Sequence, residues 1–345
     1  MRVGLVYDLR DDYRALGFAD DELAEFDFGA TIDAIEAALA ALGHQTERVG
    51  NVRALAQRLA AGARWDLVFN TAEGLRGFGR EAQVPALLDA FGLAYTFSDP
   101  LVSALTLHKG MAKRVLRDAG VPTAPFHVVG DEGELAAVAL PFPLFVKPVA
   151  EGTAKGIDPG SRVTEPGALA ARCRSIWAKY AQPALVEPFL PGREFTVGVL
   201  GAGAAAHTIG TLELKLRASA EPGVYSYLNK EHSEEHVDLP LADAEAAAQL
   251  EPVALAAWRA LGARDAGRID LRLDARGEPM VLELNPLPGL HPTHSDLPIL
   301  WSALGRRYET LIEAIVESAA ARRAELAARP RPAGRRRPVL ASSRA

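Results

Sequence analysis

The chain of 345 residues is short of several features that would point to particular protein classes. Its single cysteine, Cys173, excludes a disulfide within the chain and fits a reducing compartment. No apolar run approaches the roughly 20 residues that a membrane-spanning helix needs, and the apolar part of the start, MRVGLVYDLRDD, is too short for a signal peptide. The net charge of −6 offers no positive excess for nucleic acid. We therefore expect a cytoplasmic protein with neither nucleic acid nor membrane as a partner.

Lysine is also scarce, because only seven of the 38 basic residues are lysines. Where any cation would serve, this chain uses arginine, so each lysine can mark a need for a compact, rotatable ammonium group. Compositional drift is the alternative explanation. Cys173 lies in a helical pattern, ALAARCRSIWAKY, which indicates packing and not a nucleophile. The seven lysines are Lys109, Lys113, Lys147, Lys155, Lys179, Lys215 and Lys230.

The rest of the composition is that of a globular protein, with 49% hydrophobic and 24% charged residues, and its pattern changes along the chain. Strand and helix signals alternate over residues 1–97, which predicts an open, mostly parallel α/β domain. Residues 98–182 begin with a helical stretch and continue to the strand PLFVKPV, and we assign them to a central domain. Strands joined by turns over residues 183–320 predict an α+β domain with an antiparallel sheet.

Two helices and a tail complete this division of the chain. One helix near residues 243–262 interrupts the C-terminal strands, and a last helix is expected near residues 306–328. The end of the chain, counted from residue 321 to 345, is basic and contains the proline- and arginine-rich run RPRPAGRRRP. We expect this tail to be disordered and solvated, with contact to nucleic acid or membrane as the alternative.

The segment GRIDLRLDARGEPMVLELNP consists of two alternating apolar runs on either side of Arg276-Gly277, which we interpret as a two-residue hairpin turn. This turn would place Asp270 opposite Glu283 and Arg268 opposite Asn285. Period-two alternation puts these four side chains on one face. The opposite face would then carry Ile269, Leu271, Leu282 and Leu284.

Two interpretations of this polar face stay open on the pattern alone. Like charges that face each other across strands destabilise the pair, so a positive group is expected between the acids. In the simpler interpretation the face is exposed to solvent, and Arg268 and Arg272 screen the acids. In the other, Asp270, Glu283 and the amide oxygen of Asn285 bind a divalent metal, and hard oxygen ligands of this kind suit Mg²⁺ that also binds phosphates.

The strand that ends in Lys147 is followed at once by VAEGTAKGI. A lysine at a strand end, before a small loop that contains glycine, can bind phosphates with its ammonium and the backbone N–H groups of the loop. The spacing differs from GxxxxGK[ST], so this loop is not a P-loop.

Four motifs in order identify the chain as resembling the ATP-grasp superfamily, and within it the D-alanine–D-alanine ligase family. The resemblance covers residues 65–315, and the first strand and helix also fit. It implies a three-part ATP-grasp fold with an N-terminal open parallel α/β domain, and an ADP-forming ligase that joins a carboxylate to an amine. The motifs are SALTLHKGMAKRVLRDAGVPTAPF, VKPVAEGTAKGI, ALVEPFLPGREFTVGVLG and GRIDLRLDARGEPMVLELNPLPGL.

For ATP, the resemblance implies two lysines on the phosphates, a loop that covers the phosphates, a strand end beside the adenine and an acid on the ribose. The three metal ligands considered above match the family's ligands for Mg²⁺ (or Mn²⁺). The matching residues are Lys109 and Lys147 for the phosphates, Glu151, Gly152, Thr153 and Gly156 for the loop, Glu187, Phe189 and Leu190 for the adenine, and Glu194 for the ribose.

The resemblance also implies which side chains take part in the reaction. Arg268 matches an arginine that stabilises the acyl phosphate and the tetrahedral intermediate. Lys230 falls where a flexible loop of the family supplies a lysine to the γ-phosphate. Together with Lys147, these two residues are the predicted catalytic residues. The segment from Pro286 to Gly289 would hold the chain rigid beside the acceptor site.

The sequence departs from the family where substrates bind. Glu73 replaces a histidine, and an acid there would favour a cationic or amine-bearing substrate, unless it is a solvated loop acid. The family's N-terminal glutamate has loose candidates in Glu22 and Glu25, and Glu231 replaces a tyrosine. After NPLPGL the chain reads HPTHSDLPIL, one residue longer than expected, which puts D-alanine specificity in doubt. The predicted substrate contacts are Glu25, Glu73, Gly289, His294, Ser295 and Asp296.

We therefore predict an ATP-dependent ligase for small carboxylate and amine substrates, either D-alanine or another amino-acid or peptide pair. A homodimer is the expectation from the family. A regulatory protein that binds ATP without catalysis is the alternative from another class. The run HSEEH at 232–236 fits a zinc peptidase pattern, but its polar setting favours chance. GAGAAA at 201–206 leads into another strand, so we expect a turn and not a dinucleotide site.

Overall fold

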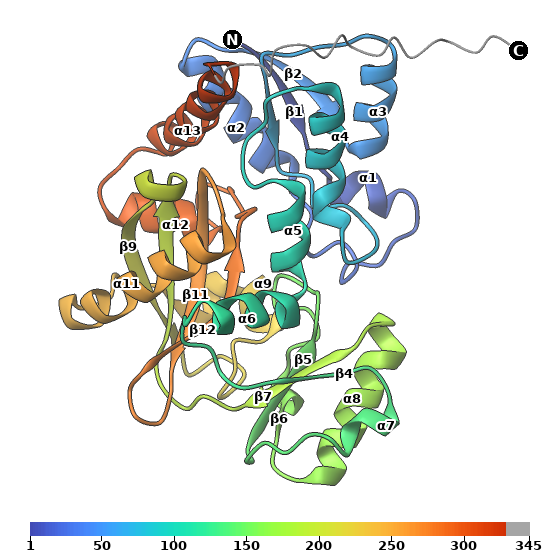
Figure 1. Cartoon of the computed structure of the whole chain (residues 1–345), viewed down its shortest axis with the longest axis vertical. Helices are drawn as coiled ribbons and strands as arrows, with labels where there is room; N and C mark the ends of the chain where they lie inside the picture. The colour runs from blue at the N-terminus through green and yellow to red at the C-terminus, as the bar shows by residue number, and fades with distance from the viewer. Residues whose placement is uncertain (329–345) are drawn as a thin grey trace, which may run out of the picture.

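A computed structural model describes residues 1–328, with side chains described as far as Arg322. The strands form a three-stranded, a five-stranded and a four-stranded sheet. Figure 1 shows the three-stranded sheet with its helices at one end of the molecule and the four-stranded sheet at the other, with the five-stranded sheet between them. The predicted combination of an α/β unit with α+β units is confirmed. Within the described residues, no helix has the length and apolar character that crossing a membrane requires.

The N-terminal unit is an open parallel sheet with helices on both faces. Its elements are β1 (Arg2–Val6), α1 (Arg10–Arg14), α2 (Gly29–Ala41), β2 (Gln45–Gly50), α3 (Val52–Ala60), β3 (Leu67–Asn70), a 3-10 helix at Arg80–Ala82 and α4 (Gln83–Phe91). The strand order is β2-β1-β3. Val3 and Leu5 pack on the side of α2, and Val6 packs on the side of α3 and α4. Burial on both faces explains the continuous apolar run of β1.

The four-stranded sheet is antiparallel, in the order β4-β7-β5-β6. Its elements are β4 (His127–Val129), α7 (Glu132–Leu135), β5 (Leu144–Pro148), a 3-10 helix at Pro159–Ser161, β6 (Arg162–Val163), α8 (Pro166–Tyr180) and β7 (Ala184–Pro188). The predicted boundary at residue 183 is therefore wrong for β7, which pairs with β4 and β5. Alternation along one strand does not reveal which sheet that strand joins. Cys173 on α8 is buried against this sheet, in a packing position.

The five-stranded sheet is antiparallel, in the order β10-β9-β8-β11-β12. Its elements are β8 (Glu194–Leu200), a 3-10 turn at Gly203–Ala205, β9 (His207–Leu216), α9 (Tyr227–Glu231), α10 (Ser233–His236), β10 (Val237–Asp238), α11 (Ala244–Leu261), β11 (Ala266–Leu273) and β12 (Pro279–Asn285). The GAGAAA run is the turn between β8 and β9, as predicted. Trp258 of α11 and Ile269 of β11 lie at the centre of the core on one face.

Two helices before the four-stranded sheet pack on this same core. They are α5 (Pro100–Leu107) and α6 (Lys109–Asp118). Val102 of α5 and Leu116 of α6 belong to the cluster of Trp258 and Ile269. The chain from residue 98 to the end of α6, which the sequence assigned to the central domain, thus packs with the C-terminal sheet. The reason is that α6 presents its apolar side to α11 and β12.

The last two helices return the chain to the N-terminal unit. They are α12 (Asp296–Ala303) and α13 (Tyr308–Ala328). Ile312 and Ile315 of α13 share a cluster with Ile32 and Ile35 of α2, and Figure 1 shows the two helices side by side. Residues 321–328, which the sequence counted as tail, continue α13. The rest of the predicted tail lies outside the described residues.

The β11–β12 hairpin contains two deviations that cancel each other. Asp274 and Glu278 face each other across the turn, so three residues connect the strands where two were predicted. A bulge then adds one residue to β12, so that Leu271 faces Val281 while Asp270 faces Glu283. The predicted pairs Asp270–Glu283 and Arg268–Asn285 are thereby confirmed. The predicted position of Leu282 on the apolar face is wrong, because the bulge turns it to the same side as Glu283.

Candidate active site

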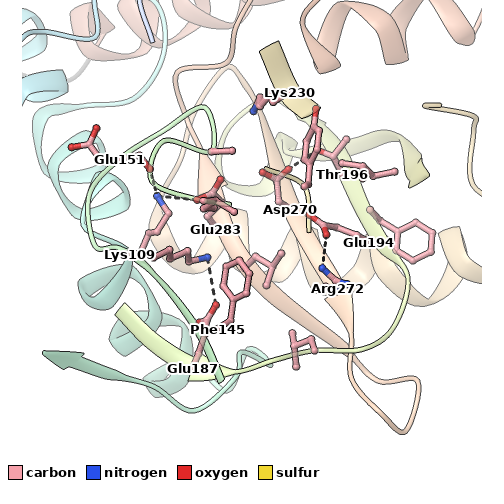
Figure 2. Close-up of a pocket in the computed structure, with 18 of the residues that line it drawn as sticks. Lys109, Phe145, Glu151, Glu187, Glu194, Thr196, Lys230, Asp270, Arg272 and Glu283 are labelled. Carbon is pink, nitrogen blue, oxygen red and sulfur yellow. Dashed lines mark hydrogen bonds and ion pairs between the residues drawn. The ribbon is translucent and has the colours of Figure 1, made fainter. Parts of the chain in front are cut away.

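A pocket lies between the four-stranded and five-stranded sheets, and we call it the inter-sheet pocket (Figure 2). One end of it is apolar. Phe145 and Phe189 lie with ring centroids 6.4 Å apart, and the guanidinium of Arg272 lies 5.0 Å from the Phe189 ring centroid. Leu190 and the bulged Leu282 complete this end. A slot of flat and aliphatic groups suits a planar ring such as a purine.

Glu187 lies at the back of the inter-sheet pocket, between two lysines. Its carboxylate oxygens lie 3.0 Å from Nζ of Lys113 and 3.4 Å from Nζ of Lys147. Burial by itself would raise the pKa of Glu187, but the two lysines lower it, so this carboxylate is charged. The side chain predicted to face adenine therefore orients Lys147. Lys113 was not predicted, although its position four residues after Lys109 places both on one side of a helix.

Lys109 is the first residue of α6, where His108 caps the helix. Its Nζ lies 3.0 Å from Oε2 of Glu283 and donates to the backbone carbonyl of Glu151 at 2.5 Å. Figure 2 shows its ammonium pointing to both of these partners. Burial would raise the pKa of Glu283, but Lys109, Lys147 and Arg268 together hold it well below its usual value. Lys109, the predicted phosphate ligand, has a side chain that is 8% exposed, and its ammonium is held by two partners.

The predicted metal ligands lie together at the end of the hairpin. Oδ1 of Asp270 accepts a hydrogen bond from Thr196 Oγ1 at 2.7 Å, and the amide nitrogen of Asn285 donates to Oδ2 at 3.1 Å. Side-chain exposures of 15% for Asp270 and 24% for Glu283 exclude the open solvent face considered from the sequence. Two carboxylates and an amide on one strand pair are a donor set that fits Mg²⁺. In the described part of the chain, no three His, Cys, Asp or Glu side chains gather as a metal site.

The guanidinium of Arg268 lies between Asp270 and Asp296. Its Nη1 lies 2.6 Å from Oδ1 of Asp270 and 3.4 Å from Oδ2 of Asp296. Lys230 of α9 also faces this point, and among the described residues its ammonium has no ion-pair partner. Burial lowers the pKa of Lys230, and the charge of Arg268 adds to this effect. Such an ammonium is available for an anionic group.

The predicted ribose ligand Glu194 is at the rim of the inter-sheet pocket, where its Oε2 lies 2.9 Å from Nη1 of Arg272. Burial raises the pKa of Glu194, and Arg272 opposes the rise. The carboxylate is 18% exposed, so one edge of it faces the pocket. Arg272, which was considered only as a screening charge, holds this acid and stacks on Phe189.

The loop at residues 151–156 follows β5 and has an unusual backbone. Thr153 and Ala154 adopt positive φ values of 49° and 55°. Gly156 has a φ of 73°, and a Cβ atom there would lie 2.5 Å from Cγ of Pro148, so only glycine fits. Glu151 is held by Lys155 at 2.7 Å and by Gln182 at 2.5 Å. The loop is thus fixed in a curve around the end of the pocket.

Glu25, predicted as a substrate contact, lines a second pocket described below, and both oxygens of its carboxylate are bonded within the chain. Its Oε1 accepts from the backbone N–H of Gly152 at 2.5 Å, and its Oε2 accepts from Nη2 of Arg80 at 2.7 Å. Nη1 of Arg80 in turn donates to the carbonyl of Ala150 at 3.0 Å. Both oxygens are engaged, so Glu25 joins the loop to the N-terminal unit. Sequence alternation does not reveal a pairing across 127 residues.

A second pocket adjoins the first, between the N-terminal unit, the 151–153 loop and the 285–296 segment. Glu73 and Asp296 line it, as predicted for substrate contacts. Ser295 Oγ accepts from the backbone N–H of His291 at 3.0 Å, and it lies so close to Gly289 that a Cβ atom there would be 2.7 Å away. His294 lies at the mouth of the pocket, with its ring nitrogen 3.2 Å from Oε1 of Glu234.

The two pockets meet at one set of side chains. At this junction, three cationic and three acidic side chains lie together with the predicted metal ligands. A negatively charged group bound in either pocket would meet the same cations there. The side chains that line both pockets are Lys109, Glu151, Tyr225, Lys230, Arg268, Glu283 and Asp296.

The HSEEH run forms a short helix near the mouth of the second pocket. The rings of His232 and His236 lie 6.2 Å apart in a T-shaped contact. Within the range the structure describes, no metal-binding cluster includes them. The peptidase pattern therefore has no structural support.

Known proteins with similar sequences and folds agree with this geometry. The family model described as the D-ala D-ala ligase C-terminus matches residues 115–317. A D-alanine–D-alanine ligase of Bordetella petrii is 38% identical over 275 residues, which cover 78% of this chain and 79% of that protein. An uncharacterized protein y4sG of Sinorhizobium fredii is 35% identical over 301 residues, covering 84% and 88%.

Solved structures share the fold at lower identity. A D-alanine–D-alanine ligase of Bacillus anthracis complexed with ATP superposes with a TM-score of 0.72 at 20% identity, covering 94% of this chain and 99% of the other. The VanG D-Ala:D-Ser ligase of Enterococcus faecalis gives a TM-score of 0.70 at 18% identity, covering 92% and 99%. Family model, relatives and fold agree with the motifs. The chain belongs to the D-alanine–D-alanine ligase family and has the ATP-grasp fold.

Proposed function

We propose that this enzyme, an ATP-dependent ligase by its family, joins the carboxylate of one amino acid or peptide to the amine of another at the junction of the two pockets. A carboxylate oxygen attacks the γ-phosphorus of ATP, which gives an acyl phosphate and ADP. The amine then attacks the activated carbonyl carbon, inorganic phosphate leaves, and the amine gives up a proton. The observation that carries this proposal is the set of cations shared by a slot for a planar ring and a second, polar pocket.

The inter-sheet pocket supports the binding of ATP with the adenine between Phe145 and Phe189. In this placement Lys147, held by Glu187, and Lys109, held by Glu283, neutralise phosphate oxygens. The loop at residues 151–156 offers backbone N–H groups at the same end. Preorganised cations of this kind stabilise charge that develops during phosphoryl transfer without rearranging.

We further propose that Asp270, Glu283 and Asn285 hold Mg²⁺ (or Mn²⁺). The metal would supply charge neutralisation between the phosphates. In the structure Arg268 and Lys109 pair with the two carboxylates, so this chain keeps the acid pair charged and oriented. Arg268 is also placed to stabilise the oxyanion on the carbonyl under attack, and Lys230 to meet the transferred phosphate.

The substrates belong to the class of small amino acids or short peptides, as the names of the relatives suggest for those proteins. The identity of the pair is open, because Glu73 and Asp296 stand where the family pattern differs. A homodimer and a cytoplasmic location stay predictions that follow from the family resemblance.

The test is ADP and phosphate release from Mg-ATP with D- and L-amino acids, singly and in pairs. We expect turnover that needs both a carboxylate and an amine. Glu283→Ala should reduce it on the order of 10²–10³-fold, and Glu245→Ala, at an exposed site on α11, should leave it unchanged. ATP binding without turnover for any pair would support a regulatory ATP-binding protein and contradict the ligase.

A further inference from the structure

The second pocket contains three acids that have no counter-ion. Glu73 and Glu81 line its wall, and within the described residues neither side chain has a hydrogen-bond or ion-pair partner. Glu81 is only 9% exposed. Asp27 is the third, and its one side-chain partner is the hydroxyl of Thr71 at 2.7 Å. Buried acids are normally paired, so an unpartnered carboxylate on a pocket wall indicates a missing ligand.

Nearby cations are committed elsewhere. Arg10 donates to the backbone carbonyls of Phe26 and Ala24 and pairs with Glu231 at 2.9 Å. Arg80 is used by Glu25 and the carbonyl of Ala150. Within the described residues, neither guanidinium forms an ion pair with any of the three acids, although the charge of Arg80 acts on Glu81. Lys109 and Lys230 line the same pocket, but among the described residues neither pairs with these three acids, so a cationic ligand would add an ion pair that the chain itself does not form.

A metal ion does not fit this wall. Throughout residues 1–322, whose side chains are described, no three acids come together in a manner suited to a metal. A group that spreads its charge over several donors, such as an ammonium or guanidinium on a flexible chain, fits a dispersed set of carboxylates better.

We infer that one substrate carries a second cationic group besides its α-amino group, and that Glu73, Glu81 and Asp27 bind this group. The inference rests on the proposed function, because it assigns the substrate class of the same site. A single α-ammonium can neutralise one carboxylate, which leaves the other two unpaired. A basic amino acid or a peptide that contains one supplies the additional charge.

The pKa values of the three acids agree with this assignment. Burial raises the pKa of Glu81 to about 7. Arg80 and Lys109 oppose this rise, and the charges of Glu25 and Glu283 add to it. Burial also raises the pKa of Asp27 to about 7, with Asp8 as the nearest like charge. For Glu73 burial raises the pKa well above its usual value, and Glu81 is the leading like charge. Arg80 opposes the rise for Glu73 and Glu81, and Arg10 opposes it for Asp27, but burial outweighs the cation in each case.

The experiment compares pairs of amino acids that differ in one terminal ammonium, ornithine against norvaline and lysine against norleucine, each in both stereochemical forms. ADP release is measured with each as sole amino acid and with alanine as partner. We expect kcat/KM at least 10-fold higher for the charged member of a pair. Glu73→Gln and Glu81→Gln should reduce this preference by 10-fold or more, mainly through KM. Glu245→Gln is the matched control and should keep the preference.

Calorimetric binding of ornithine and norvaline to the wild-type protein, with a non-hydrolysable ATP analogue present, provides a second measurement that needs no variant. Turnover without a preference for the charged member would overturn the inference and leave the ligase standing. Absence of turnover for every pair would overturn the proposed function, and the calorimetry would then decide the inference. Equal binding of ornithine and norvaline would contradict it.

Discussion

At the scale of single residues, the site depends on cations that are fixed by buried acids. Lys113 is the clearest case, since it is 1% exposed and never reaches the inter-sheet pocket wall. It completes a row of Lys113, Glu187 and Lys147, and so it sets the charge and position of a phosphate ligand from behind. Its role was missed from the sequence because a buried lysine behind an active site has the same helical spacing as a surface one.

Lys113→Met should destabilise the protein by about 3 kcal/mol, because it breaks one of the two buried ion pairs of Glu187 and leaves only Lys147 to balance that charge. The double variant Lys113→Met/Glu187→Gln should recover at least half of that loss. Chemical denaturation of the single variant, the double variant and the wild type measures this. A loss below about 1 kcal/mol in the single variant would show that the pair contributes little.

Glu81 gives a prediction about pH. Its pKa in the folded protein is about 7 against a usual 4.5, so the folded state binds its proton more tightly. Because of this tighter binding, Glu81 makes its full contribution to the free energy of unfolding below pH 4.5. That contribution is lost as the pH rises from 4.5 through 7, by at most about 3 kcal/mol in total. Glu81→Gln should therefore match the wild-type Tm at pH 5 and exceed it at pH 7.5 by several degrees.

Thermal unfolding at the two pH values, without amino acids or nucleotide, checks this expectation. Asp27 is present in both proteins, whereas removal of the Glu81 charge also lowers the raised pKa of Glu73, which adds to the gain of the variant at pH 7.5. A variant that is less stable than the wild type at pH 7.5 would mean that Glu81 has a favourable partner in solution.

At the scale of elements, the β11–β12 hairpin shows why sequence reasoning could bring the proposed metal ligands together and still misplace a neighbouring residue. The predicted turn was one residue too short, and the bulge corrects the register before Asp270. The two predicted pairs of polar residues are correct, but the predicted face of Leu282 is wrong. A bulge cannot be recognised from the alternation of apolar residues along a strand. Most elements were found from periodicity. Their assignment to sheets was less accurate, as β7 and α6 illustrate.

The loop after β5 can be tested through Gly156. An alanine there would combine a φ of 73° with a contact of 2.5 Å to Pro148, so the loop must move. We expect Gly156→Ala to raise KM for ATP about 10-fold or more, since a misplacement of about 1 Å in an active site can cost 10²-fold. ADP-release kinetics provide the measurement.

Gly43→Ala is a matched control for this test. Gly43 has a φ of 80°, and a Cβ atom there meets nothing within 4 Å. It should lose about 1 kcal/mol of stability for the backbone alone and keep its KM for ATP. An equal KM effect in both variants would point to general loosening of the fold and not to the phosphate loop.

At the scale of the whole molecule, the N-terminal unit is tied to the ATP-binding loop through Glu25 and Arg80. Arg80→Met removes the hydrogen bonds to Glu25 and to Ala150, and leaves Glu25 as a buried charge. We expect kcat/KM to fall about 10²-fold, and amide hydrogen exchange to rise in both segments 22–28 and 150–156. Arg48→Met, which breaks ion pairs to Asp33 and Glu36 on the surface, is the control.

Hydrogen exchange followed by mass spectrometry resolves the two segments separately. An increase limited to the residues around Arg80 would show that the N-terminal unit and the loop move independently. The sequence could not predict this link, because contacts between units depend on how the units dock and not on the pattern within either one. For the same reason the sequence assigned α5 and α6 to the central domain, whereas in the structure they pack with the five-stranded sheet and α11.

The three acids without an ion pair among the described residues, Asp27, Glu73 and Glu81, all precede residue 97, whereas the lysines of the proposed phosphate site begin at Lys109. Energy input and partner choice are therefore inherited on separate stretches of one chain. A lineage can change a few side chains within its first hundred or so residues, and with them the partner that is joined, as long as Glu25 and Arg80 keep their contacts to the loop after β5. Introducing these three acids into a relative that uses uncharged amino acids should therefore move its choice of partner towards cationic ones.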